Sequence, residues 1–109
     1  MSKTLFGTIT ITLDGEDYEL VPTLAAVRAI EARFGGLRGA SQTINALSVE
    51  GCAAIVVAGA GLKGKEADAV SEKVWQAGVL DVSAKLNAYL MALYNPKGPE
   101  SGKPAAVEE

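Results

Sequence analysis

The sequence predicts a small α+β domain, in which an N-terminal antiparallel β-hairpin packs on a bundle of about four to five helices. Residues 5–13 alternate between apolar and polar side chains, a turn dipeptide follows, and apolar residues then recur at helical spacing. The length of 109 residues is typical of one domain. We therefore expect a single domain over residues 1–94, with the hairpin in 4–22 and the helices in 23–94.

The hairpin is predicted because the register set by its turn also places the apolar side chains of both strands on one face. Asp14-Gly15 tolerates the positive φ angles that a type I′ turn requires, so it sets the register of residues 5–13 against residues 16–22. This register separates apolar from polar side chains, because a strand alternates its faces. The expected cross-strand pairs are Ile11 with Tyr18, Ile9 with Leu20, Thr12 with Asp17, and Thr10 with Glu19.

The helices are predicted from capping residues and from apolar spacing. Thr23 is a candidate N-cap for a helix over residues 24–34, and Gly35-Gly36 favours a left-handed stop. Four more helices are expected over residues 41–47, over 49–62 after Ser48 as N-cap, over 71–77, and over a last segment capped by Asp81. Residues 64–68 are expected to form a loop.

Two of these helices stand out by their apolar residues. The helix over 49–62 is apolar almost all round, which indicates that it is central in the core or covered by a partner. The last helix has a stripe at spacing i, i+4, i+7, i+8 and i+11, made of Val82, Leu86, Tyr89, Leu90 and Leu93. Residues 95–109 are rich in Pro and Gly and lack such spacing, so we expect a flexible, disordered tail.

Charge and composition exclude several classes of partner. Lys and Arg number 10 against 13 Asp and Glu, a net charge of −3, and the basic residues are scattered, so no nucleic acid partner is expected. The longest apolar run, residues 52–62, is far shorter than the roughly 20 residues of a membrane span. A lone cysteine, Cys52, cannot form an intrachain disulfide, and the N-terminus has no secretory apolar block. We expect a cytoplasmic protein that does not contact membranes.

The sequence offers no catalytic, cofactor or metal site. It contains no histidine, and an apolar neighbourhood should keep the Cys52 thiol protonated. Metal binding would depend on carboxylates alone, and the acidic residues of the hairpin lack the spacing of a calcium loop. These residues are expected to keep an edge strand soluble. Glu31 has no visible acid or base companion and receives no catalytic role.

One glycine-rich segment, residues 59–65, resembles a nucleotide-binding loop. Gly59-Ala60-Gly61-Leu62-Lys63-Gly64-Lys65 satisfies G-x-G-x-x-G and most of a P-loop. However, a P-loop requires Ser or Thr after its lysine to hold magnesium, and this position is Glu66. A nucleotide-binding regulator therefore stays as an alternative, and a helix that ends in glycines is preferred.

Several short motifs follow one another over about residues 8–93: Leu13-Asp14-Gly15, Tyr18-Glu19-Leu20, Leu24, Ile30-Glu31, Phe34-Gly35, Ala60-Gly61-Leu62 and Ser71-Glu72-Lys73-Val74. In their order and spacing they resemble the phage tail assembly chaperones of the gene-transfer-agent type. The basic loop Lys63-Gly64-Lys65 and the Pro-rich tail depart from the family pattern. The resemblance implies no catalytic or cofactor residues.

The resemblance implies a chaperone that shields the tape-measure protein while the tail tube polymerises, and that is absent from the finished particle. The tail tube protein is a further possible partner, and the chain could form a homo-oligomer. A structural virion component, such as a tail tube or connector subunit, is the alternative from another class. The residues expected to contact a partner, unless they close the core of the monomer, are Trp75, Leu86, Tyr89, Leu90, Met91, Leu93 and Tyr94.

Overall fold

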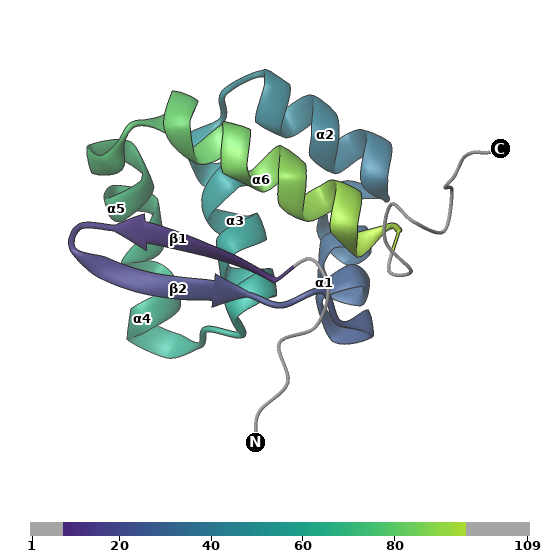
Figure 1. The fold of residues 1–109 in the computed structure, drawn as a ribbon, viewed down its shortest axis with the longest axis horizontal. Coiled ribbons are helices and arrows are strands. Elements are labelled where there is room, and N and C mark those ends of the chain that lie inside the picture. Colours follow the sequence, from purple (N-terminus) through teal and green to yellow (C-terminus); the bar gives the residue numbers. More distant parts are fainter. Residues whose placement is uncertain (1–7, 96–109) are drawn as a thin grey trace, which may run out of the picture.

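A computed structural model describes residues 8–95 and confirms the predicted α+β class (Figure 1). This part of the chain forms a two-stranded antiparallel sheet followed by six helices. Helix α3, Val49–Ala60, packs against four helices and one strand: α1 (Leu24–Phe34), α2 (Leu37–Asn45), α5 (Val70–Ala77), α6 (Val79–Leu93) and β2 (Glu16–Leu20). Helices α5 and α6 adjoin strand β1 (Ile9–Leu13). Residues 96–109 of the predicted C-terminal tail and residues 4–7 of the predicted hairpin lie outside the described residues.

The hairpin has the predicted register. Strands β1, Ile9–Leu13, and β2, Glu16–Leu20, pair as expected, including Ile11 with Tyr18. Asp14 and Gly15 have φ angles of 51° and 78°, the left-handed values that the turn requires. One face is buried against the helices, and its side chains are Ile11, Leu13, Tyr18 and Leu20.

The helices with side-chain caps begin where the sequence predicts. Helix α1, Leu24–Phe34, starts at Thr23, whose Oγ1 accepts a 3.1 Å hydrogen bond from the Ala26 amide, and it ends at Gly35 with φ of 83°. Helix α3 begins after Ser48, whose Oγ accepts from the Gly51 amide at 3.0 Å. It ends at Gly61, slightly before the predicted end.

The uncapped elements differ from the prediction. Helix α2, Leu37–Asn45, begins four residues early, because Leu37 packs on the core together with the buried Ala40 and Ile44. Helix α4, Gly64–Asp68, replaces a predicted loop; it buries no residue, so it has no apolar pattern to reveal it. Neither of these helices has a side-chain cap.

The last two helices also begin earlier than predicted. Helix α5 spans Val70–Ala77, and helix α6 spans Val79–Leu93 with Gly78 between them. Asp81 lies in the first turn of α6 rather than at its cap, where its carboxylate still complements the positive end of the helix dipole. Among residues 8–95, no helix combines the length and the apolar character that crossing a membrane requires.

One buried cluster joins the hairpin and the helices. Its centre includes Ile55 and Val56 of α3, and the Tyr89 side chain of α6, all fully buried. The Tyr89 hydroxyl donates a 2.7 Å hydrogen bond to the Val21 carbonyl, which directly follows β2. A buried hydroxyl with a partner avoids the cost of an unpaired polar group, so Tyr89 can sit in this core.

Candidate partner-binding groove

Helix α3 is buried on most sides but leaves one stripe uncovered. Glu50, Ala54, Val57 and Ala58 follow helical spacing, so they lie on one face of the helix. Ala54, Val57 and Ala58 are partly exposed, whereas Cys52, Ile55 and Val56 on other faces are buried. Helix α3 is therefore central in the core, as the sequence predicted. One stripe of it stays accessible from outside.

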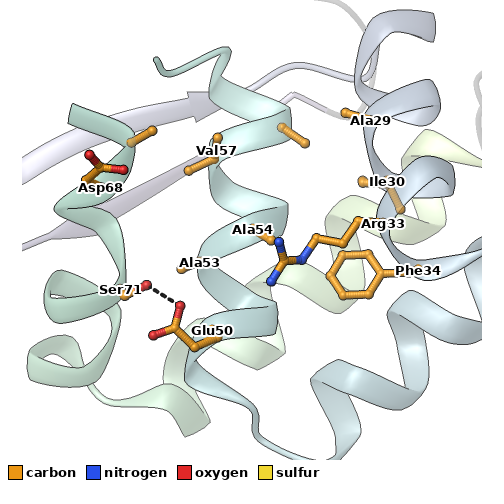
Figure 2. A pocket seen from close by; sticks show the side chains of 12 residues that line it. Ala29, Ile30, Arg33, Phe34, Glu50, Ala53, Ala54, Val57, Asp68 and Ser71 are labelled. Atoms are coloured by element: carbon orange, nitrogen blue, oxygen red, sulfur yellow. Dashed lines mark hydrogen bonds between the residues drawn. The ribbon is translucent and has the colours of Figure 1, made fainter. Parts of the chain in front are cut away.

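This stripe is the floor of an open groove of about 400 Å³ (Figure 2). Helix α1 forms one wall with Ala29, Ile30, Arg33 and Phe34. The other wall comes from α4 and the start of α5, with Ala67, Asp68 and Ser71. Alanines supply much of the lining, so the backbones of floor and walls are accessible to a close approach.

The two walls carry opposite charges. Figure 2 shows the Arg33 side chain extending from α1 towards Ala54, while Asp68 lies on the opposite wall. The Arg33 guanidinium lies 5.8 Å from the centroid of the Phe34 ring, close enough for a cation–π contact. The Glu50 carboxylate, at one end of the floor, accepts a 2.8 Å hydrogen bond from the Ser71 hydroxyl.

The groove combines an apolar floor with charged walls. Its apolar floor and charged margins resemble the grooves that take the apolar face of an amphipathic helix. Its lining contains no cysteine or histidine. In the described part of the chain, no three side chains of the metal-binding types gather in a ligand arrangement. Cys52 is buried on another face of α3, where burial raises the pKa of its thiol.

The structure corrects most of the predicted partner surface on α6. Four of the predicted residues are at most 4 % exposed, because the stripe packs on α2, α3 and β1: Leu86, Tyr89, Leu90 and Leu93. In this conformation they close the core of the monomer and cannot contact a partner. The sequence had left open the alternative that these residues close the core of the monomer, and the burial of all four agrees with it.

The other three predicted residues reach the surface but lie outside the groove. Trp75 is 69 % exposed and Met91 is 56 % exposed. Tyr94 is partly buried, and its hydroxyl donates a 3.1 Å hydrogen bond to Glu31 Oε2. The groove residues were missed because alanines carry little hydrophobic signal, and the only sequence indication was the all-round apolar character of α3.

The glycine-rich segment lacks the setting of a phosphate site. Gly59 lies in the last turn of α3, and Gly61, with φ of 69°, ends that helix. A P-loop follows a strand and leads into a long helix, whereas this segment follows the C-terminus of α3 and leads into the five-residue helix α4. The preferred interpretation of a helix that ends in glycines is confirmed.

The acidic hairpin makes a specific contact with α5. The Glu16 carboxylate pairs with the Lys73 ammonium and accepts a 2.8 Å hydrogen bond from the Tyr18 hydroxyl. Lys73 Nζ also lies 2.9 Å from the Tyr18 oxygen and 5.6 Å from its ring centroid. The hydrogen bond and charge of Lys73 lower the pKa of Glu16, and the carboxylate in turn raises the pKa of Lys73.

Comparison of the chain with models of protein families, with curated proteins and with solved structures finds no match. A proposal for the function therefore depends on the fold, the groove and the sequence motifs.

Proposed function

We propose that the chain is a phage or gene-transfer-agent tail assembly chaperone that binds and shields a helical segment of the tape-measure protein. The observation that carries this proposal is the uncovered stripe of α3, an apolar floor between two helical walls. The ordered motifs of the sequence support the same function. The chaperone acts in the host cytoplasm and is absent from the finished particle.

A groove of this kind matches the problem that a tape-measure protein presents. Such a protein is a long helix with exposed apolar surface, and exposed apolar patches promote aggregation until they are covered. Ala54 and Ala58 allow a helix to approach α3 closely, and Val57 adds apolar contact. The exposed Trp75 and Met91 offer further contact surface to the same partner or to the tail tube protein.

Co-purification with the tape-measure protein of the same genome tests the proposal. The chain is co-expressed with a tagged tape-measure protein, and the amount recovered with the tag is measured. Ala54→Arg should abolish recovery, because a long cation fills the floor of the groove. Ala84→Arg is the matched control, since Ala84 is an exposed helical alanine on α6 that does not line the groove. Failure of the unmodified chain to co-purify would contradict the proposal.

Mass spectrometry of purified particles separates the chaperone from a structural virion component. A chaperone that leaves before completion should be missing from particles, whereas a tail tube or connector subunit should be abundant. Abundant copies would favour the structural alternative.

A further inference from the structure

Charged side chains are arranged asymmetrically around the groove, which a purely apolar groove would lack. Arg33 is on the α1 wall, Asp68 is on the α4 wall, and Glu50 is at the end of the floor next to Ser71 (Figure 2). Across residues 8–95, neither Arg33 nor Asp68 has an ion-pair partner, and Glu50 is bound by a neutral hydroxyl. All three side chains are exposed, so an occupant would meet their charges directly.

The lining of this groove suits a helix better than an extended peptide. Both walls and the floor are helices, so no edge of a β-sheet lines the groove. An extended peptide would find no strand edge here, and its own amides and carbonyls would lose water without gaining partners. A helix satisfies its backbone internally and needs to present only side chains to the alanine-rich floor.

We infer that the groove selects an amphipathic helix with acidic residues on one flank of its apolar stripe and basic residues on the other. The acidic flank lies along Arg33, and the basic flank lies along Asp68 and Glu50. This inference rests on the proposed function of the groove as a helix-binding site. To that function it adds which charges flank the apolar stripe of the bound helix and in which direction the helix lies.

The direction follows from geometry. Turning a helix end for end in a groove exchanges its two flanks relative to the walls. A mixed-charge helix therefore satisfies both walls in one direction only, whereas a helix with two like flanks meets a like charge at one wall in either direction. Charges on a surface interact over about 8 Å at physiological salt, so the flanks must lie directly along the walls to be distinguished.

Three synthetic peptides of about 20 residues, long enough to be helical, test the selection. They share one Ala/Leu stripe and differ in their flanks: glutamate on one and lysine on the other, lysine on both, or glutamate on both. Fluorescence anisotropy with the full chain measures each dissociation constant. We expect the mixed peptide to bind roughly tenfold more tightly than the others, which corresponds to about 1.4 kcal/mol of binding free energy.

Charge reversal then moves the preference in a predictable way. Arg33→Glu should favour the peptide with two lysine flanks, and Glu50→Lys with Asp68→Lys should favour the peptide with two glutamate flanks. The triple variant should recover the mixed peptide in the reversed direction. A spin label at the peptide N-terminus reports that direction, because it broadens amide signals at Ala29 or at Phe34, towards opposite ends of the α1 wall. Arg28→Glu, at an exposed residue of α1 outside the groove, is the matched control.

The outcomes separate this inference from the proposed function. Equal binding of the three peptides, or a preference that ignores the charge reversals, overturns the inference even if the tape-measure protein still co-purifies. Absence of binding by every peptide also overturns it. Loss of tape-measure co-purification by the unmodified chain overturns the proposed function, whichever peptide binds best. Circular dichroism of each variant confirms that an altered preference comes from a folded chain.

Discussion

The ring of Tyr89 lies against Gly59, so that a Cβ atom at Gly59 would come within 2.9 Å of the Tyr89 hydroxyl oxygen and 3.0 Å of two ring carbons. The same glycine accepts a 3.1 Å hydrogen bond from the Val21 amide through its carbonyl oxygen, while Tyr89 donates to the Val21 carbonyl at 2.7 Å. Gly59 therefore allows α3, α6 and the end of the hairpin to meet at one point.

This contact predicts that Gly59→Ala destabilises the protein. Helix propensity alone would stabilise α3 by about 0.5–1 kcal/mol. Overpacking against the Tyr89 ring should outweigh that gain and lower the free energy of unfolding by about 1–3 kcal/mol. Urea denaturation measures the change. In a Tyr89→Leu background the same substitution should cost much less, and a stabilised Gly59→Ala protein would show that the contact is easily relaxed.

Removal of the Tyr89 hydroxyl should weaken the fold through the Val21 carbonyl. Tyr89→Phe leaves this acceptor with only its 2.9 Å hydrogen bond from the Thr23 amide, and we expect the free energy of unfolding to fall by about 0.5–1.5 kcal/mol. Tyr94→Phe is the control, because its hydroxyl bonds to the exposed Glu31 and water can replace it. Equal losses for the two variants in thermal or urea denaturation would contradict the assigned role of Tyr89.

Alkaline pH should remove the advantage that Tyr89 provides. Burial raises the pKa of Tyr89 from 10.0 to about 12, so the unfolded chain loses this proton before the folded chain does. The stability contributed by the neutral hydroxyl is complete below pH 10 and is lost as the pH rises through about 12. The difference in unfolding free energy between the unmodified chain and Tyr89→Phe should therefore shrink over this range. A constant difference would argue against burial of the hydroxyl.

Leu47 is the residue whose replacement by glycine should stabilise the protein. It has φ of 59° in the loop that ends α2, where the Ser48 amide bonds to the Thr43 carbonyl at 3.3 Å. This left-handed position favours glycine, and a non-glycine residue there costs about 1–2 kcal/mol. Leu47 is 39 % exposed, so some apolar contact is lost, and we expect Leu47→Gly to gain up to about 1 kcal/mol.

Calorimetry of Leu47→Gly and Leu47→Ala checks this prediction. Leu47→Ala removes the same side chain without relieving the backbone, so it should not stabilise the protein. A higher melting temperature for both variants would assign the effect to the exposed side chain rather than to the φ angle.

The contact of Glu16 with Lys73 should be visible in acid. Because the pKa of Glu16 is lowered from 4.5, its contribution to stability is present above pH 4.5 and is lost as the pH falls through the folded value. In Lys73→Met the midpoint of the Glu16 carboxyl signal in NMR should rise. Lys85→Met, outside this contact, should leave it unchanged, and an unchanged midpoint in Lys73→Met would refute the assigned pairing.

Local signals in the sequence were sufficient for part of this structure. Asp14-Gly15 supplies the turn, and period-two alternation then permits only one register that buries the apolar face. Thr23, Ser48 and Gly35 act on backbone groups within a few residues, so the ends of α1 and the start of α3 could be predicted. The four buried residues of the predicted partner surface show the limit of such signals, because an apolar stripe indicates burial but does not show whether the monomer core or a partner buries it.

The sequence by itself determined the α+β class, the hairpin register and the capped helices, because these depend on interactions within a turn or between adjacent strands. Only the tertiary structure decided that the α6 stripe closes the core, that the Tyr89 ring packs against Gly59, and that Arg33 and Asp68 lie on opposite walls of one groove. These relationships join residues far apart in the chain, and the way the helices pack sets which side chains meet and which stripe stays uncovered.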